Sequence, residues 1–561
     1  MGYASYSFIR WILTNAVKVF FRQIDIVGLM RVPVSGPVIF VANHNNQFVD
    51  PMLLISALPR ILRFLIAGKS LRRPLVGSIA RMARAIGVER AQDLAFKGQG
   101  SVTAQAQATT VQGTGTSFLK ELTPGCKMNV DSDLEFAVKS VESDTSCTVD
   151  PCPRGVSSVD FKILPRIDQK HMYSQVNEAL KSGDCIGIFP EGGSHDRASL
   201  LDLKPGVAIM ALGAMQAGAG QVQIVPCGLN YFDAYRFRSR VVVEFAEPFS
   251  VPTDLVELYG KDKRLAVQKL MDMVHDAMQA CTPGAKDYDE HQALITMRAL
   301  YKPRGKQMTP EESLKLTKYF ANARRQLRDD SRMDKVIEMT RDYNDLLRAT
   351  GLRDRDVRLS LVPDRGMAWR TISAALQLIL LSPITLSALF LGMPVIMTTK
   401  AMAIREKEKA LKSSTVKVKA LDVVASYKIL VGLVLVPIYS LFLAAVAVLL
   451  FKTPWWFLFV FYLFIIPLYF YIGIVACDHS VRAFRRFRST ILFYCCTPTA
   501  VILKKGLVER RNELQQLVRS LVEELGSKTI DFPSECVIKL DDLETHASHV
   551  QSLVAPLLPR H

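Results

Sequence analysis

The chain has 561 residues, of which 49% are hydrophobic, and a formal net charge of +17. Such a length exceeds what one hydrophobic core organises, so we expect two or more domains. Its basic charge suits a nucleic acid or an anionic membrane surface, but the sequence has no RNP-like motif or basic-aromatic interleaving. We therefore expect a lipid bilayer and no nucleic acid as partner. The ten cysteines form no CxxC pair and no zinc set with histidine, which predicts free thiols and no metal site.

Residues 1–25 are apolar with basic side chains at positions 10, 18 and 22. This segment lacks the long uninterrupted apolar stretch and the small-residue cleavage site of a secretory signal. The pattern predicts an amphipathic helix, either lying at a bilayer interface or packed on the domain that follows.

Short apolar runs alternate with helical segments over 26–90 and 164–255. Strands are expected at 38–42, 185–189, 223–226 and 241–245, and helices at 70–85, 173–182 and 206–216. Strands separated by helices indicate an α/β layered domain.

Residues 91–163 interrupt this alternation with short β-prone runs rich in Thr, Ser, Gln and Val. Gly, Pro and Asp separate the runs, which predicts a small β module inserted into the α/β domain. A poorly ordered polar insertion is the alternative.

Residues 256–365 are highly charged and have a helical period, which predicts a charged helical linker with a solvated face. One helix start is well marked, since Thr309 is followed by Pro310 and, three residues after the threonine, by Glu312.

Two apolar stretches, 429–451 and 455–476, are each long enough to cross about 30 Å of hydrocarbon, and a short turn makes them a transmembrane hairpin. Basic clusters precede and follow this hairpin, at 400–419 and 482–488, and the positive-inside rule puts both in the cytosol. The apolar stretch 371–399 is interrupted by Pro383 and Pro394. We therefore predict that 371–399 is a re-entrant or broken membrane segment and that 478–561 is a cytosolic C-terminal tail.

Four motifs occur in order within the α/β segments: PVIFVANHNNQFVD at 37–50, AIGVER at 85–90, IFPEGGSHDR at 188–197 with LKPG at 203–206, and IVPCGLNY at 224–231. Their order and composition resemble the glycerol-3-phosphate and lysophosphatidate acyltransferase superfamily. Within it they look most like the fungal and protist glycerol-3-phosphate (dihydroxyacetone-phosphate) sn-1 acyltransferases of the endoplasmic reticulum. The family fold implied is an acyltransferase-type layered domain with C-terminal membrane helices.

Two departures from the usual family motifs stand out. Five residues separate His44 from Asp50, where many relatives have four, although the fungal type shares this spacing. Ser194 stands two residues after Gly192, where many relatives have an arginine, and the next arginine is Arg197.

The resemblance implies that His44 and Asp50 are the catalytic pair. A neutral histidine would take the proton of an alcohol that attacks a thioester, and the carboxylate would orient the ring and stabilise the imidazolium. The attacking alcohol is the substrate itself, so no acyl-enzyme is expected. A second dyad of His195 and Asp196 is not needed for this route.

A phosphate on the acceptor requires cations and free backbone N–H groups. The substrate-binding residues expected from the motifs are Arg90, Glu191, Gly192, Gly193, Arg197 and Lys204. Of these, Glu191 is expected to face an acceptor hydroxyl.

The activity implied by the resemblance is transfer of an acyl group from acyl-CoA to the sn-1 hydroxyl of glycerol-3-phosphate. Acyl-CoA is expected as co-substrate and no cofactor is expected. The resemblance also implies a multi-pass protein of the endoplasmic reticulum membrane with a cytosolic catalytic domain. Dihydroxyacetone phosphate as acceptor, lysophosphatidate acylation, and a non-catalytic membrane scaffold on the same fold are the alternatives.

Overall fold

The computed structural model describes residues 3–131, 134–197, 199–282, 288–301, 308–327, 330–360, 367–414, 416–494 and 498–529. Its centre is an α/β domain whose main sheet has the strand order β1 (Phe21–Val27), β15 (Ser239–Phe245), β14 (Gln223–Tyr231), β2 (Val38–Ala42), β13 (Cys185–Ile188), β3 (Leu62–Ala67) and β4 (Ile86–Val88), with β16 (Phe249–Ser250) beside β14.

Five strands of this sheet, from β14 through β2, β13 and β3 to β4, run parallel to one another. Their carboxyl ends therefore meet at one edge of the sheet, where ligands of open α/β sheets bind. The polar residues of the first three motifs follow strands that end at this edge, and the fourth motif lies within β14.

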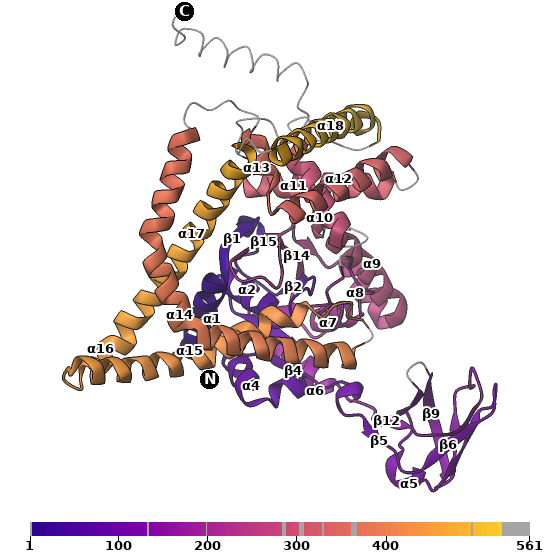
Figure 1. Ribbon diagram of the computed structural model, residues 1–561. Coiled ribbons are helices and arrows are strands. Elements are labelled where there is room, and N and C mark those ends of the chain that lie inside the picture. The colour runs from indigo at the N-terminus through magenta and orange to yellow at the C-terminus, as the bar shows by residue number, and fades with distance from the viewer. Residues whose placement is uncertain are drawn as a thin grey trace, which may run out of the picture.

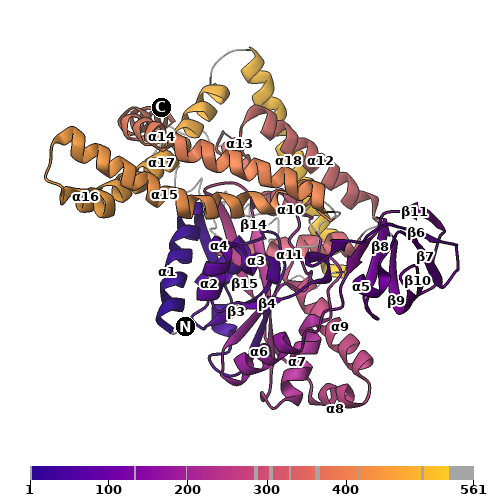
Figure 2. The same cartoon turned by 90° about the horizontal axis from the view of Figure 1, so that it is seen from below.

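Helices cover both faces of the sheet, as Figures 1 and 2 show. Strand β2 contributes Phe40 to the core on one face and Ile39 and Val41 to the core on the other, because successive strand side chains alternate. The first face is covered by α1 (Tyr3–Phe20), α2 (Val49–Ala57) and α4 (Pro74–Met82), and the second by α6 (Lys170–Lys181), α7 (Gly206–Gln216), α8 (Thr253–Lys261) and α9 (Lys263–Cys281).

The structure shifts several expected boundaries. Residues 21–25 belong to β1 and not to the N-terminal helix, because they pair in parallel with β15. Two helices, α3 (Gly68–Leu71) and α4, replace the single helix expected at 70–85, and Pro74 occupies the first turn of α4. Helix α1 packs on the domain through Tyr6, Leu13 and other buried side chains, yet Trp11 stays 65% exposed.

The insertion is an ordered β module. Its strand order is β11 (Val156–Val159), β6 (Ser101–Ala104), β7 (Thr110–Thr114), β10 (Ser146–Val149), β9 (Leu134–Ser143), β8 (Lys127–Asp131), β12 (Lys162–Leu164) and β5 (Phe96–Lys97), with α5 (Phe118–Glu121) at its side. The module has its own hydrophobic core around Phe118, Phe136 and Phe161. It lies beside the α/β domain in Figure 1, and the predicted fold class is confirmed.

The charged region does not form an independent linker. Its helices α10 (Tyr288–Tyr301), α11 (Pro310–Gln326), α12 (Ser331–Thr350) and α13 (Asp354–Ser360) pack with α18 (Pro498–Thr529) from the expected tail. Helix α11 begins at the predicted capping box, and the buried Arg511 of α18 donates to Asp354 at 2.7 Å. Residues 530–561 of the expected tail lie outside the described residues.

Three helices in the described part of the chain are long and apolar enough to cross a membrane, over 369–412, 422–451 and 457–492. The elements here are α14 (Met367–Ser413), α15 (Asp422–Phe451), α16 (Phe457–Val460), a π-helical turn (Phe461–Ile465) and α17 (Ile466–Tyr494). The expected break in 371–399 is wrong, because Pro383 and Pro394 lie inside one continuous helix. Proline bends a helix without always ending it, and Figure 1 shows the first part of α14 along α17 and its later part beside α15.

Candidate active site

A cavity of about 740 Å³ opens at the edge of the sheet where the parallel strands end. Residues that follow β2, β3, β4 and β13 line it, together with residues of α1, α2, α4, α6, α7 and α15 and of the inserted β module. The motifs at 37–50, 85–90 and 188–206 thus converge, because each follows a strand that ends at this edge.

His44 and Asp50 form a hydrogen-bonded pair at the cavity. His44 Nδ1 lies 2.9 Å from Asp50 Oδ2, which also accepts from the backbone N–H of Asn46 at 2.8 Å. Asp50 Oδ1 accepts from the hydroxyl of Tyr231 at the end of β14. Because Nδ1 is engaged, Nε2 is the ring nitrogen that can exchange a proton with a molecule in the cavity.

Asp50 is fully buried in the first turn of α2. This burial raises the pKa of Asp50 above its ordinary value, although the hydrogen bonds from His44, Tyr231 and Asn46 oppose the shift. Three donors on one carboxylate fix its position, so the extra residue between His44 and Asp50 does not separate the pair.

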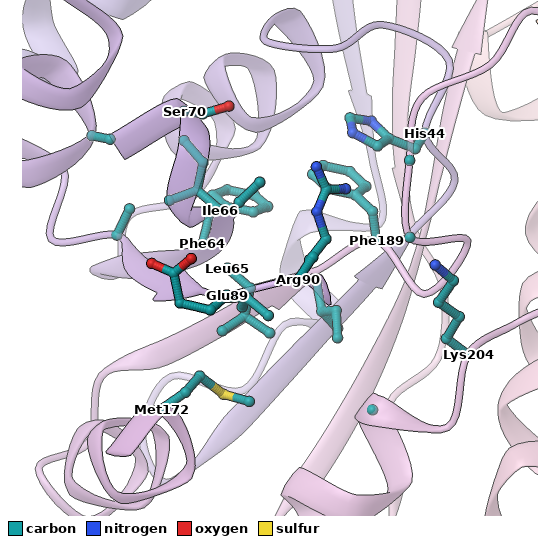
Figure 3. Close-up of a pocket in the computed structure, with 18 of the residues that line it drawn as sticks. His44, Phe64, Leu65, Ile66, Ser70, Glu89, Arg90, Met172, Phe189 and Lys204 are labelled. Atoms are coloured by element: carbon teal, nitrogen blue, oxygen red, sulfur yellow. The ribbon is translucent and has the colours of Figure 1, made fainter. Parts of the chain in front are cut away.

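The His44 ring is fixed by a contact on its face as well as by the hydrogen bond at its edge. It stacks on Phe189, with ring centroids 4.0 Å apart and planes 10° apart, and Phe189 stacks in turn on Phe64 of β3. Figure 3 shows His44 beside Phe189 at the rim of the cavity. The imidazole therefore has one orientation, set by an apolar stack and a buried carboxylate.

Cationic side chains approach the same space from two walls. Arg90 reaches toward His44 from the end of β4, and Lys204 approaches from the other side (Figure 3). Arg90 Nε pairs with Asp93 at 2.7 Å, which fixes the guanidinium.

The predicted glycines Gly192 and Gly193 also line the cavity. Gly192 has φ +75°, and a Cβ atom there would lie 2.4 Å from Lys204 Nζ. A glycine at 192 thus provides both the left-handed backbone and the room for the lysine.

Glu191 does not face the cavity, contrary to the expectation that it contacts an acceptor hydroxyl. It is 4% exposed and accepts from the backbone N–H groups of His44 at 2.8 Å and Leu201 at 3.0 Å, and it pairs with His195. Burial acts to raise the pKa of Glu191, but its hydrogen bonds with His195, Leu201 and His44 hold this pKa below the ordinary value. Glu191 therefore stabilises the backbone of the His44 loop and does not contact the cavity.

His195 takes part in the same stabilising contacts. Its Nδ1 accepts from the backbone N–H of Arg197 at 3.1 Å, so Nε2 carries the proton that faces Glu191. With an exposed fraction of 1% and both nitrogens engaged, His195 is not part of a second dyad with Asp196.

Arg197, expected to bind a phosphate, is not among the residues that line the cavity. Its Nε donates to the carbonyl of Val416, between α14 and α15, at 2.9 Å. Of the eight predicted site residues, the structure brings His44, Arg90, Gly192, Gly193 and Lys204 to the cavity with Asp50 behind His44, and it assigns Glu191 and Arg197 to supporting contacts.

One further wall of the cavity is apolar. Leu13 of α1, Met52 and Ile55 of α2, Ile79 of α4 and Leu430 of α15 line it. The site therefore combines a base, a cationic end and an apolar chamber, which suits an amphipathic substrate.

Some supporting residues were not identified from the sequence. Tyr231 is the last residue of the IVPCGLNY motif, and its phenol was not recognised as a partner of Asp50. Asn43, next to the catalytic histidine, ties β2 to β14 by donating to Leu229 O and accepting from Leu229 N–H. Among the described residues there is no cluster of three or more His, Cys, Asp or Glu that could hold a metal ion.

Comparison with known proteins matches two families. The family described as "Acyltransferase" matches residues 23–117 and 150–230, and "Glycerol-3-phosphate acyltransferase 2 C-terminal domain" matches 293–530. The chain is 33% identical to glycerol-3-phosphate O-acyltransferase 1 of Saccharomyces cerevisiae in an alignment that covers 94% of this chain and 72% of the yeast protein. The chain belongs to the glycerol-3-phosphate O-acyltransferase family.

Two further relatives agree with this membership. An uncharacterised acyltransferase of Schizosaccharomyces pombe is 37% identical over 77% of this chain and 67% of its own length, and glycerol-3-phosphate O-acyltransferase 2 of S. cerevisiae is 30% identical over 76% and 64%. The predicted family is confirmed, and this acyltransferase is an enzyme rather than a bare membrane scaffold. The unmatched residues 118–149 lie within the inserted β module, whereas the second match joins the helical region, the apolar helices and α18 in one family unit.

Proposed function

We propose that this acyltransferase transfers a fatty acyl group from acyl-CoA to the sn-1 hydroxyl of glycerol-3-phosphate, giving lysophosphatidate. The single observation that carries the proposal is the His44–Asp50 pair on a cavity with cationic and apolar walls. The two S. cerevisiae relatives, both named glycerol-3-phosphate O-acyltransferases, support the choice of acceptor. Dihydroxyacetone phosphate is a second acceptor that fits the same cationic wall.

The chemistry needs only side chains of this chain and the two substrates. His44 Nε2 takes the proton of the acceptor hydroxyl while its oxygen bonds to the thioester carbonyl carbon, and the resulting imidazolium is stabilised by Asp50. As the tetrahedral intermediate collapses, the C–S bond breaks and the proton passes from His44 to the CoA sulfur. Direct attack by the substrate oxygen leaves no acyl-enzyme.

The cationic wall and the apolar wall bind different parts of the two substrates. Arg90 and Lys204 supply positive charge for the acceptor phosphate, and Arg90 has the planar geometry that suits phosphate oxygens. The apolar wall takes the acyl chain, since each buried methylene contributes about 0.8 kcal/mol. His44 lies where the two walls meet, as the reacting hydroxyl and carbonyl require.

We further propose that the protein is a multi-pass protein of the endoplasmic reticulum membrane and that its catalytic domain is cytosolic. Both basic segments contact parts of the chain that precede the apolar helices: the carbonyl of Val416 accepts from Arg197, and Arg488 donates to the carbonyl of Thr350 at 2.8 Å. These contacts favour one side of the bilayer for the basic segments and the catalytic domain, which requires α14 to enter and leave the bilayer on that side. The positive-inside rule makes this side cytosolic.

An assay of the purified protein with palmitoyl-CoA and one acceptor at a time tests the proposal. The acceptors are glycerol-3-phosphate, dihydroxyacetone phosphate and lysophosphatidate, and His44→Ala is the control for the catalytic base. We expect the largest kcat/KM with glycerol-3-phosphate and no turnover by the variant. A strong preference for lysophosphatidate would overturn the acceptor assignment.

A further inference from the structure

Both loops of the active site are attached to the same membrane-associated element, which we define as the docking segment, residues 416–426. The first attachment comes from the His44 loop. The backbone N–H of Gln47 donates to the carbonyl of Asp422 at 3.2 Å, and that of Phe48 donates to Ser426 Oγ at 2.8 Å. Ser426 is fully buried and lies in α15, one of the candidate membrane spans.

The second attachment comes from residues 194–197, after the FPEGG turn. Ser194 Oγ donates to Asp422 Oδ2 at 2.6 Å, and Asp422 is also paired with Lys417. Asp196 accepts three backbone N–H groups of the docking segment, from residues 418 and 419 at 2.8 and 2.7 Å and from residue 421 at 3.3 Å. With Arg197 bound to the carbonyl of Val416, this loop holds the segment along most of its length.

The contact with Ser426 has a direct bearing on Asp50. Phe48 immediately precedes α2, whose first turn contains Asp50, and no side chain of its own caps this helix. The first N–H groups of a helix have no partner within it, so a partner from elsewhere fixes the start of the helix. Ser426 supplies such a partner from a helix 378 residues further along the chain.

We propose that Ser426 is a positioning residue for acyl transfer, and that the docking segment makes α15 part of the catalytic framework. Ser426 fixes the start of α2, the start of α2 places Asp50, and Asp50 orients His44. The inference rests on the proposed function, since the positioned groups are those of the acyl transfer. It explains why Leu430, one turn further along α15, lines the cavity.

The test compares two serine-to-alanine variants on the same helix. Ser426→Ala removes the acceptor of the Phe48 N–H, whereas Ser440→Ala removes the hydroxyl of another buried serine of α15 that does not line the cavity. We expect Ser426→Ala to lower kcat about tenfold or more, since small displacements of reacting groups have effects of this size. The KM values for glycerol-3-phosphate and palmitoyl-CoA stay within about twofold of wild type, and Ser440→Ala behaves as wild type.

A pH profile separates positioning from a general loss of folded protein. Displacing Asp50 changes the proton affinity of His44, so the acidic limb of the kcat profile moves in Ser426→Ala. A loss of folded protein would instead lower kcat equally at every pH. Unchanged kcat, an unmoved acidic limb, or an equal loss in Ser440→Ala would each overturn the inference.

A second variant covers the case in which Ser426→Ala does not fold. Asp196→Ala loosens the docking segment from a partly buried position outside the hydrophobic core, and we expect the same fall in kcat and the same movement of the acidic limb. Wild-type kcat and pH profile in this variant would overturn the inference. If the wild-type enzyme prefers lysophosphatidate, the proposed function fails, and the comparison of variants is then made with that acceptor.

Discussion

Replacing Asp50 with asparagine tests the catalytic pair with almost no change of shape. The carboxylate accepts from Asn46 N–H and His44 on one oxygen and from the Tyr231 hydroxyl on the other. An asparagine preserves this geometry if its carbonyl oxygen faces His44 and its amide faces Tyr231, whose hydroxyl rotates to accept. The substitution Asp50→Asn therefore removes a charge and leaves the arrangement in place.

The size of the effect follows from the charge that is removed. When His44 takes a proton, the imidazolium lies about 4 Å from the carboxylate centre, where two charges interact by about 4 kcal/mol at an effective dielectric constant of about 20. Because about 1.4 kcal/mol corresponds to tenfold in rate, kcat should fall about 10³-fold. The KM for glycerol-3-phosphate should change little, since Asp50 is buried behind His44.

The assay is initial-rate acylation of glycerol-3-phosphate by purified protein in detergent, with thermal unfolding followed on the same samples. Tyr231→Phe is the matched control, because it removes one hydrogen bond to Asp50 and keeps the charge. That bond is present before and during reaction, so kcat should fall by no more than about tenfold. If folded Asp50→Asn retains more than a tenth of the wild-type kcat, the carboxylate does not support the base and the reasoning fails.

Three further predictions concern the cationic wall and a partly buried histidine. Arg90→Gln and Lys204→Gln should each raise the KM for glycerol-3-phosphate about 10- to 100-fold, because each removes a hydrogen bond to a charged group and such bonds have effects of this size. The KM for palmitoyl-CoA in the same rate assay should not rise. Gly192→Ala should produce the Lys204→Gln phenotype, because its Cβ occupies the site of Lys204 Nζ; a wild-type KM would contradict that contact. Burial lowers the pKa of His291, with help from the Arg298 charge, to about 4 from 6.5. The unfolded chain then binds the extra proton, so this stabilisation is complete above pH 6.5 and roughly 3 kcal/mol is lost as the pH falls to 4. Melting temperatures of His291→Gln should therefore fall less than those of wild type over this range, and parallel curves would refute the assignment.

The parts of the fold that the sequence predicts are those whose signal is local. Strand β2 is a run of five apolar residues, and α11 begins at a capping box that needs only Thr309, Pro310 and Glu312. Strand β3 was missed because Arg63 interrupts its apolar pattern. That arginine is accommodated by an ion pair with Asp184, a partner 121 residues away that no local pattern reveals.

The same distinction applies to the site. His44, Asp50, Arg90 and Lys204 lie within motifs at the ends of strands, and parallel strands bring such ends together. The contacts of Arg197 depend on Val416, more than two hundred residues further along the chain, so its sequence neighbours could not show which way it points. The packing of α18 with the helical region also depends on residues far away in the sequence, because an amphipathic helix does not specify the surface on which it packs.

The departure at Ser194 follows from this non-local contact. Many relatives have an arginine at the corresponding position, but here the side chain at 194 contacts Asp422, a fully buried carboxylate already paired with Lys417. A second cation against one buried carboxylate would leave an uncompensated charge, which is costly in a protein interior. A serine instead donates one neutral hydrogen bond and keeps the pair balanced. The cation that the cavity needs on this side comes from Lys204, for which Gly192 leaves room, so attachment to α15 and provision of positive charge are divided between two residues.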